Sequence, residues 1–308
     1  MGILCVTIDL DEIDCYHRIH GLAAPAGLAA HAVYLRALPR LVRLLEEQKV
    51  RATLFAVGQD IEAGSEPGSL LRDLTGRGHE IGNHTMGHPY DLTLLDADAQ
   101  AAEIDRGSQA IARVTGLPPR GFRAPGYNVN LGLLDLLSDR GYLYDSSVFP
   151  CPAYYSLKAA AMGVMTLRGR RSNAVMGDPR LLAAPTGPYR VGRDGAWSKG
   201  QGLCELPISV VTPARLPFIG TNITMMGRKA ASLLARQAAR LPFFNLELHG
   251  IDLADAQGDG LSGLVPHQIG LKDPLDKKRG AIESVIATLL DKGMEPMTLA
   301  EAAQRVFV

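Results

Sequence analysis

The chain has 308 residues, of which 46% are hydrophobic, so it can bury a core large enough for one big α/β domain or two modest ones. Basic and acidic residues number 32 each, and no long run of one sign occurs. This balance argues against a nucleic-acid-binding protein, which needs a clustered basic face. Aromatic residues make up only 6%, so no stacking platform for bases or long glycans is evident.

Nothing in the sequence indicates export or membrane insertion. The first residues contain no basic segment and reach an acid at Asp9, unlike a signal peptide, and no apolar run is long enough to span a bilayer. The cysteines form no C-x-x-C pair, which favours reduced, buried thiols; they are Cys5, Cys15, Cys151 and Cys204. We therefore expect a cytoplasmic protein, with a peripheral place at the inner membrane face as the alternative.

Apolar runs typical of strands alternate with helix-like stretches along most of the chain. Strands are expected at 3–9, 52–57, 80–85, 121–126, 142–147, 204–211 and 243–248. Helices are expected at 28–48, 67–77, 96–115, 131–140, 226–240 and 277–292, followed by a last short helix. Thr93 and Asp96 are predicted to form a capping box before the helix at 96–115.

The alternation stops between residues 148 and 203. Gly, Pro, Arg and Tyr separate short extended pieces there, which indicates an insertion or a set of covering loops. Elsewhere the pattern predicts parallel strands joined by crossover helices, although periodicity does not separate a barrel from an open sheet. We expect a single α/β domain over residues 1–308 that carries this insertion.

Polar residues stand at the carboxyl ends of successive predicted strands: Asp9, His84, Arg123 and His249. Parallel α/β folds build their functional sites at that edge, whether the sheet is open or closed. Core packing would not place polar residues there so regularly. The sequence therefore predicts a functional site formed by these strand ends.

His84 and His88 lie in the segment HTMGH, where two imidazoles four residues apart can face one ion if the segment makes a single helical turn. Thr85 stands where the zincin signature has glutamate, which excludes that class. Gly87 and Pro89 favour a tight turn over a long helix. The pair is a candidate metal site that needs support from other residues.

Asp9 and Asp11 end the first apolar strand, where buried carboxylates are costly unless a cation or hydrogen-bond donors meet them. Glu12 and Asp14 follow, so a turn or helix N-cap is the alternative interpretation. The two aspartates, the two histidines of the HTMGH segment, Arg123 and His249 together supply what metal-assisted amide hydrolysis needs. These needs are three protein ligands, a base, and an acid for the leaving amine.

Five segments resemble, in order, the motifs of the polysaccharide deacetylase superfamily, also called NodB homology or carbohydrate esterase family 4. They are Thr7–Asp11, His84–His88, Arg123–Gly126, Tyr144–Ser147 and Leu248–Gly250. The resemblance spans about residues 3–252. It implies a distorted (β/α) barrel of the NodB kind with about seven strands.

The resemblance also assigns roles. A metal, usually zinc but replaceable by another divalent transition metal, would be bound by Asp11, His84 and His88. Asp9 would be the general base, oriented by Arg123, and His249 the general acid. A backbone N–H of Gly126 or Tyr127 would meet the oxyanion.

Two motifs depart from the usual pattern. Leu10 separates two aspartates that are commonly adjacent, and this D-x-D spacing resembles peptidoglycan deacetylases, allantoinase-like amidases and the deformylase of lipid-linked aminoarabinose. The fourth motif, which usually supports the catalytic histidine, matches poorly. Asp145 and Asp252 are the candidates for orienting His249.

The sequence thus predicts a metal-dependent N-deacylase, either a deacetylase or a deformylase, acting on an N-acylated amino sugar that is lipid-linked or nucleotide-linked. An allantoinase-like cyclic amidase and a non-catalytic glycan-binding member are the alternatives. A cluster in the covering segment is a candidate for substrate recognition; it comprises Arg168, Arg170, Arg171, Tyr189, Arg190, Arg193 and Trp197. Among the other histidines, His79 is expected in the core, His17 and His20 in a solvated loop, and His31 and His267 at the surface.

Overall fold

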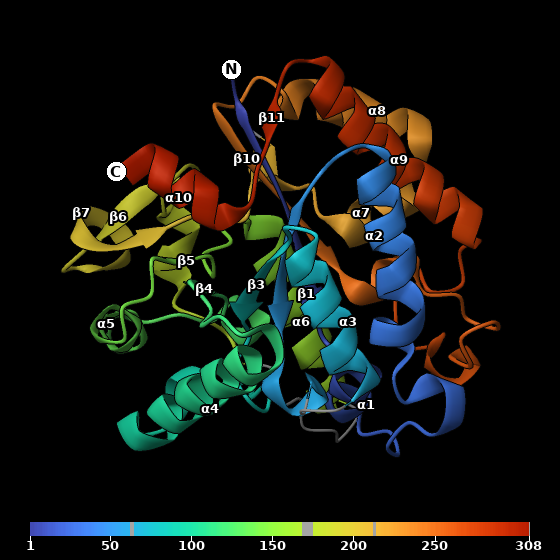
Figure 1. Ribbon diagram of the computed structural model, residues 1–308, viewed down its shortest axis with the longest axis horizontal. Coiled ribbons are helices and arrows are strands. Elements are labelled where there is room, and N and C mark those ends of the chain that lie inside the picture. The colour runs from blue at the N-terminus through green and yellow to red at the C-terminus, as the bar shows by residue number, and fades with distance from the viewer. Residues whose placement is uncertain (62–64, 168–174, 212–213, 308) are drawn as a thin grey trace. The chain divides into compact units, whose positions relative to one another are not determined.

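The computed structural model describes residues 1–308 except 62–64, 168–174, 212–213 and 308 (Figure 1). The chain divides into two compact units, each assembled from separate stretches of the sequence. Unit 1 comprises Met1–Leu54, Gly64–Glu80 and Phe218–Thr298. Unit 2 comprises Phe55–Ala63, Ile81–Pro217 and Leu299–Val308.

The central strand of unit 1 is β1 (Ile3–Leu10), and every one of its residues is buried. It pairs in parallel with β10 (Phe243–His249) and with β11 (Glu295–Pro296). The register sets Asp9 opposite His249. Because the two strands run in the same direction and stay in register, their carboxyl ends carry an acid and a histidine side by side.

Helices complete unit 1, and two of them, α8 and α9, pack against each other (Figure 1). The helices are α1 (Ile13–His20), α2 (Leu38–Glu47), α3 (Glu66–Gly76), α7 (Gly220–Met226), α8 (Arg228–Ala238) and α9 (Leu275–Asp291). A π-helical turn at Val33–Ala37 precedes α2, so the helix expected over 28–48 is interrupted.

The sequence interpretation missed α1, which begins directly after the acidic strand end. Glu12 caps it: its Oε1 accepts hydrogen bonds from the backbone N–H of Ile13 at 2.9 Å and of Val33 at 3.0 Å. The N-cap alternative considered for this acidic run is therefore correct for Glu12. Burial raises the pKa of Glu12 to about 7, against the three backbone hydrogen bonds that lower it.

Unit 2 is built on strands whose order is β3-β4-β5-β7-β6. Strands β2 (Ala52–Ala56) and β3 (Glu80–Asn83) begin in unit 1 and end in unit 2. The others are β4 (Gly121–Phe122), β5 (Tyr144–Asp145), β6 (Tyr189–Gly192) and β7 (Gly195–Glu205), with a separate pair β8 (Val210–Val211) and β9 (Leu216–Pro217). All neighbours from β3 to β7 pair in parallel, and β6 pairs antiparallel with β7.

A close approach explains one glycine of this sheet. A Cβ atom on Gly121 would lie 1.9 Å from Cζ of Tyr144, its partner in β5. Only glycine therefore allows β4 to pair with β5 while the Tyr144 ring stays buried.

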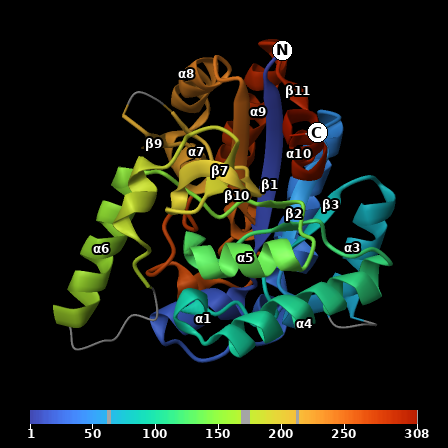
Figure 2. The same cartoon turned by 90° about the vertical axis from the view of Figure 1, so that its left-hand side faces the viewer.

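The helices of unit 2 are α4 (Ala97–Thr115), α5 (Leu131–Asp139), α6 (Pro152–Leu167) and α10 (Leu299–Phe307), as Figures 1 and 2 show. Leu133, Leu137 and Phe122 form part of the core between α5 and the strands. Asp96 caps α4 through a hydrogen bond from Ala99 N–H at 2.8 Å, so the capping box expected from Thr93 is wrong.

The expectation of irregular loops over 148–203 is also only partly right. The segment contains α6 and the hairpin β6–β7, because the run SLKAAAM consists mostly of good helix formers despite the prolines and glycines around it. Arg168, Arg170 and Arg171 lie outside the described residues.

Two simpler expectations can be compared directly with the structure. All four cysteines are buried and none of them forms a disulfide bond, as predicted. In the described part of the chain, no helix combines the length and the hydropathy required for a membrane crossing.

A buried ion pair holds the loop that follows His249 in unit 1. Asp259 is fully buried, with its Oδ2 2.6 Å from Nη1 of Arg40 and its Oδ1 2.8 Å from Nη2. Its carboxylate also accepts from the backbone N–H of Asp255. By contrast, the Arg279–Glu47 pair of the same unit is exposed to solvent on both sides.

We expect Asp259→Asn to lower the free energy of unfolding by about 2–3 kcal/mol, because it removes a charge-assisted bidentate contact from a buried position. The matched Glu47→Gln variant should change it by less than about 0.5 kcal/mol, since exposed pairs contribute little. Urea titrations of both variants measure the difference. Equal effects in the two variants would contradict the importance assigned to the buried pair.

Candidate active site

Unit 1 places three of the predicted site residues close together: Asp9, Asp11 and His249. Both aspartates are buried, although they carry charge at neutral pH in an ordinary setting. Asp9, Glu247 and His249 bring ligand-type atoms within 4.8 Å of one another. The end of β1 and β10 is therefore a compact group of carboxylates around one imidazole.

Glu247 is the residue that orients His249. Its Oε1 lies 2.8 Å from Nδ1 of His249, and its side chain is fully buried. The two residues are separated by one position on β10, so their side chains emerge on the same face of the strand. Because Nδ1 is paired with this carboxylate, we assign Nε2 as the nitrogen that exchanges a proton with a substrate.

The two candidates from the sequence hold other groups. The carboxylate of Asp252 accepts a hydrogen bond from the backbone N–H of His249 at 2.8 Å, as part of a capping box in which the backbone N–H of Asp252 faces the His249 side chain. Asp145, in unit 2, accepts from the backbone N–H and the hydroxyl of Ser147. The alternation Glu-Leu-His in a strand indicates that Glu247 and His249 share one face. This pattern could have identified Glu247 from the sequence, but it was overlooked there.

The carboxylates change the acidity of His249. Burial by itself lowers the pKa of the imidazole, but Glu247, through its charge and its hydrogen bond, and the charges of Asp11 and Asp9 outweigh burial and raise it well above the ordinary value. These carboxylates therefore favour the protonated form of the imidazole. A charged imidazole with one nitrogen held by a carboxylate is equipped to act as a general acid.

Unit 2 places His84 and His88 together by means of a strained turn. Their ring centroids are 4.8 Å apart, and both side chains are buried. Thr85 and His88 have left-handed φ values of 70° and 55°, which are unfavourable for non-glycine residues and especially for β-branched threonine. The segment is therefore not a helical turn, and it forms the tight turn that Gly87 and Pro89 favour.

Hydrogen bonds hold the strained turn in place. Thr85 donates its backbone N–H to Asn83 Oδ1 at 2.9 Å and accepts from Gly58 N–H at its carbonyl, also at 2.9 Å. Its hydroxyl accepts from the backbone N–H of His88 at 3.0 Å. Gly87 N–H donates to Glu103 Oε2 at 2.7 Å. Such strain, held by its surroundings, is common at functional sites.

The histidines fit the chemistry of a zinc site. Nδ1 of His84 lies 2.6 Å from the backbone carbonyl oxygen of Arg123, which can only accept, so Nδ1 carries the proton. This fixes the tautomer that leaves the Nε2 lone pair for a ligand, as is usual for metal-binding histidines. Nitrogen donors of this kind together with a carboxylate are typical of zinc.

Arg123 is fully buried and rigidly held. Its Nε donates to the carbonyl of Ser146 and its Nη2 to the Ser146 hydroxyl, both at 2.8 Å, and the guanidinium lies 4.3 Å from the centroid of the Phe55 ring. A cation fixed in this way adds a permanent positive charge to unit 2 at the end of β4.

The fourth predicted motif forms a support beneath Arg123. Burial raises the pKa of Asp145. Burial, and then the charge of Asp145 and a hydrogen bond to it, raise the pKa of Glu205 well above its usual value. Ser147, bonded to Asp145, accepts from the backbone N–H of Ala124 at 2.8 Å. The motif therefore stabilises the Arg123 turn.

The turn after Arg123 contains both candidates for the oxyanion contact. Gly126 and Tyr127 have φ values of 63° and 62°. The N–H of Tyr127 donates to the carbonyl of Ala124 at 3.1 Å. Because that donor is engaged within the turn, Gly126 is the better of the two candidates.

The remaining histidines have structural settings. His79 is buried and its Nδ1 accepts from Ala52 N–H at 3.1 Å, as expected for a core residue. His31 is exposed, also as expected. His17 and His20 lie on α1, not in a loop, and the His20 ring centroid is 5.0 Å from that of the half-buried His267.

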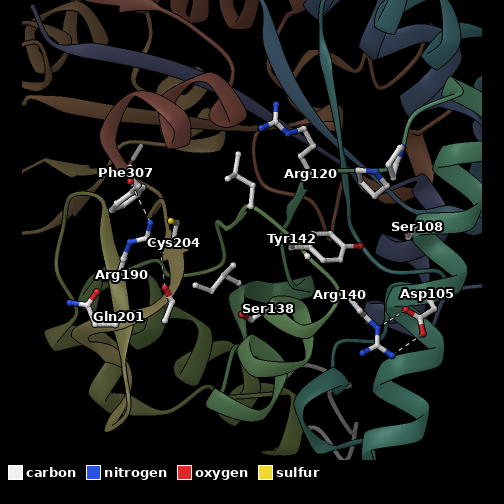
Figure 3. A pocket seen from close by; sticks show the side chains of 16 residues that line it. Asp105, Ser108, Arg120, Ser138, Arg140, Tyr142, Arg190, Gln201, Cys204 and Phe307 are labelled. Atoms are coloured by element: carbon white, nitrogen blue, oxygen red, sulfur yellow. Dashed lines mark hydrogen bonds and ion pairs between the residues drawn. The ribbon is translucent and has the colours of Figure 1, made fainter.

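A pocket of about 690 Å³ in unit 2 includes Arg190 of the predicted recognition cluster in its lining (Figure 3). Arg120 and Leu143 in its lining precede β4 and β5, so it belongs to the amino ends of these strands. Figure 3 shows Arg140 directed at Asp105 and Arg190 directed at Phe307, so these basic side chains do not converge on one point. None of the predicted catalytic residues lines it.

Comparison with known proteins shows which family the chain resembles. The family model described as polysaccharide deacetylase matches residues 32–144. The chain is 35% identical over 107 residues to a chitin deacetylase of Colletotrichum lindemuthianum, covering 34% of this chain and 42% of that protein. It is 30% identical over 111 residues to a peptidoglycan deacetylase of Helicobacter pylori, covering 36% of each.

Among solved structures, the chain resembles a protein of Mycobacterium smegmatis assigned to the polysaccharide deacetylases. The TM-score is 0.62, with 21% identity, over 99% of this chain and 90% of the other. The predicted α/β fold of the NodB kind is confirmed. The chain resembles the polysaccharide deacetylase superfamily over residues 32–144, and it spans less than half the length of the two curated relatives described above.

Replacing Glu247 with glutamine should lower the pKa of His249, because it removes the nearest negative charge while keeping the size of the side chain. An NMR titration of the imidazole signals measures the shift. His79 of the same unit serves as the internal control, since its pKa is lowered chiefly by burial and does not depend on Glu247. An unchanged titration of His249 would show that Glu247 is not its principal partner.

Proposed function

We propose that the chain is a metal-dependent N-deacylase, a hydrolase of C–N bonds other than peptide bonds, that removes an acyl group from an amino sugar. The observation that carries the proposal is the in-register pairing of β1 and β10, which sets the carboxylate of Asp9 beside the charged imidazole of His249. An acid and a base at one strand end are what amide hydrolysis requires. The names of the relatives support an acetyl group as the one removed.

The metal ligands proposed from the resemblance are Asp11 of unit 1 with His84 and His88 of unit 2. The tautomer of His84 supports this assignment. Zinc, when bound, lowers the pKa of a coordinated water from 15.7 to about 7 and polarises a carbonyl. We propose that the bound metal is zinc, which metal analysis of the purified protein identifies.

The remaining steps belong to side chains. Asp9, whose orientation we assign to Arg123, takes a proton from the attacking water. The backbone N–H of Gly126 donates to the developing oxyanion. His249 gives its proton from Nε2 to the leaving nitrogen, while Glu247 stabilises the charged ring and keeps Nδ1 protonated. Water and amide are thereby converted to a carboxylic acid and a free amine.

The proposed substrate is an N-acylated amino sugar in a glycan or in a lipid-linked or nucleotide-linked precursor. Support for the sugar comes from the relatives, one of which acts on chitin and the other on peptidoglycan by name. The precursor forms and an N-formyl group are finer proposals, which a panel of N-acetyl and N-formyl amino sugars separates.

Asp9→Asn and His249→Ala should each lower kcat by about 100-fold or more on N-acetylglucosamine oligomers, because each removes one partner of the proton transfer. Acetate release measures the rate, and metal analysis checks that the zinc content is unchanged. His31→Ala, at an exposed position, is the control. Near-wild-type activity in either variant would show that its role is misassigned.

Removing the metal with a chelator should abolish acetate release, and adding zinc should restore it. Asp11→Ala should reduce the zinc content of the purified protein, whereas Asp14→Ala, at a half-buried position on α1, should not. Inductively coupled plasma mass spectrometry gives the metal content independently of activity. Full activity in metal-free protein would overturn the metal-dependent mechanism.

A further inference from the structure

Three side chains of unit 2 converge on one side of the Gly126 turn. The Nζ atom of Lys158, on α6, lies 3.3 Å from the carbonyl oxygen of Gly126. A Cβ atom built on Gly126 would lie 3.7 Å from this Nζ, 3.5 Å from Nδ2 of Asn128 and 3.3 Å from Cδ1 of Tyr90. A cation, an amide and an aromatic ring therefore border one small volume beside the turn.

Lys158 is a half-buried cation held by groups that carry no negative charge. Burial lowers its pKa to about 8. Its recorded contacts are the Gly126 carbonyl and the Tyr154 ring, whose centroid is 5.9 Å away. Within the described parts of the chain, no carboxylate pairs with Lys158. Burying an ammonium group without a counter-charge is costly unless a ligand supplies one.

The other half-buried lysine, in unit 1, has a different setting. Burial lowers the pKa of Lys278 as well, but four aspartates oppose this effect; they are Asp252, Asp255, Asp273 and Asp259. Its counter-charges therefore come from the protein. Among the residues that the structure describes, acidic side chains therefore act on Lys278 but not on Lys158. A counter-charge for Lys158 would come from a ligand.

Asn128 forms a fixed wall of this volume. The residue is 1% exposed, and its Nδ2, the atom nearest the Gly126 turn, donates to the carbonyls of Tyr90 and Val175, both at 3.3 Å. Its Oδ1 lies on the side of Gly177, where a Cβ atom would come within 3.0 Å of it. Because Asn128 is held in this way, Lys158 is the polar group that can meet a ligand beside the turn.

We propose that Lys158 binds an anionic substituent, a carboxylate or a phosphate, on the acylated sugar. The proposal rests on the proposed function, since it takes the Gly126 turn as the place where the acyl carbonyl reacts. It makes Lys158 a specificity-determining residue that selects acidic amino sugars over neutral ones.

The test compares the binding of three sugars that differ in charge: N-acetylmuramic acid, N-acetylglucosamine 6-phosphate and neutral N-acetylglucosamine. Calorimetric titrations use the zinc-loaded full chain in the Asp9→Asn background, so that no turnover occurs. We expect the chain to bind at least one acidic sugar about 10-fold to 100-fold more tightly than the neutral sugar, as for a charge-assisted contact. A preference for one acid alone identifies the substituent.

The variants are Lys158→Gln, Lys158→Arg and Lys199→Gln, the last being an exposed lysine of the same unit. Lys158→Gln should remove the preference without changing the affinity for the neutral sugar, Lys158→Arg should retain part of it, and Lys199→Gln should leave it intact. No preference in the parent protein, or an equal loss for all three sugars in Lys158→Gln, would overturn the proposal.

These titrations, together with acetate release measured on the chain that retains Asp9, separate this inference from the proposed function. A Lys158-dependent preference for acidic sugars in a protein that hydrolyses no acylated sugar would retain the anion contact and reject the deacylase. Acetate release from neutral and acidic sugars at equal kcat/KM, with wild-type values in Lys158→Gln, would retain the deacylase and reject the specificity.

Discussion

The parallel, in-register pairing of β1 with β10 is the constraint on which the chemistry of unit 1 depends. It brings Asp9 opposite His249 and sets Glu247, two positions earlier on the same face of β10, against the imidazole. Both strands are buried along almost their whole length. A shift of the register by one residue would therefore direct the side chains of Asp9, Glu247 and His249 to the opposite face, among the apolar side chains of the core. The hydrophobic pattern of the strands therefore also fixes the geometry of the acid and the base.

Unit 2 achieves comparable precision through local strain. The turn at His84–His88 and the turn at Gly126–Tyr127 both use left-handed backbone conformations. Side-chain oxygen atoms of Asn83, Ser146 and Ser147 accept the hydrogen bonds that hold them. Buried polar networks of this kind rigidify a site where their members are hydrogen-bonded.

The sequence predicted the strand-end residues well because parallel strands with alternating helices leave one edge for polar groups, and Asp9, Arg123 and His249 stand there. It missed Glu247, since an acid inside an apolar run was taken as part of the strand alone. It missed α6 and α1 because prolines, glycines and acids near their ends indicated loops. The left-handed φ values of Thr85 and His88 depend on tertiary hydrogen bonds, which no local pattern reveals.

The most direct test of the account is the pH dependence of kcat/KM for acetate release by the zinc-loaded chain. The carboxylates around His249 raise the pKa of its imidazole, and the protonated form that can act as the acid is lost as the pH rises. The account predicts an activity that falls on the alkaline side, with this fall moved to lower pH in Glu247→Gln. An alkaline limb at the same pH in both proteins would contradict the role of the Glu247–His249 pair as the proton donor.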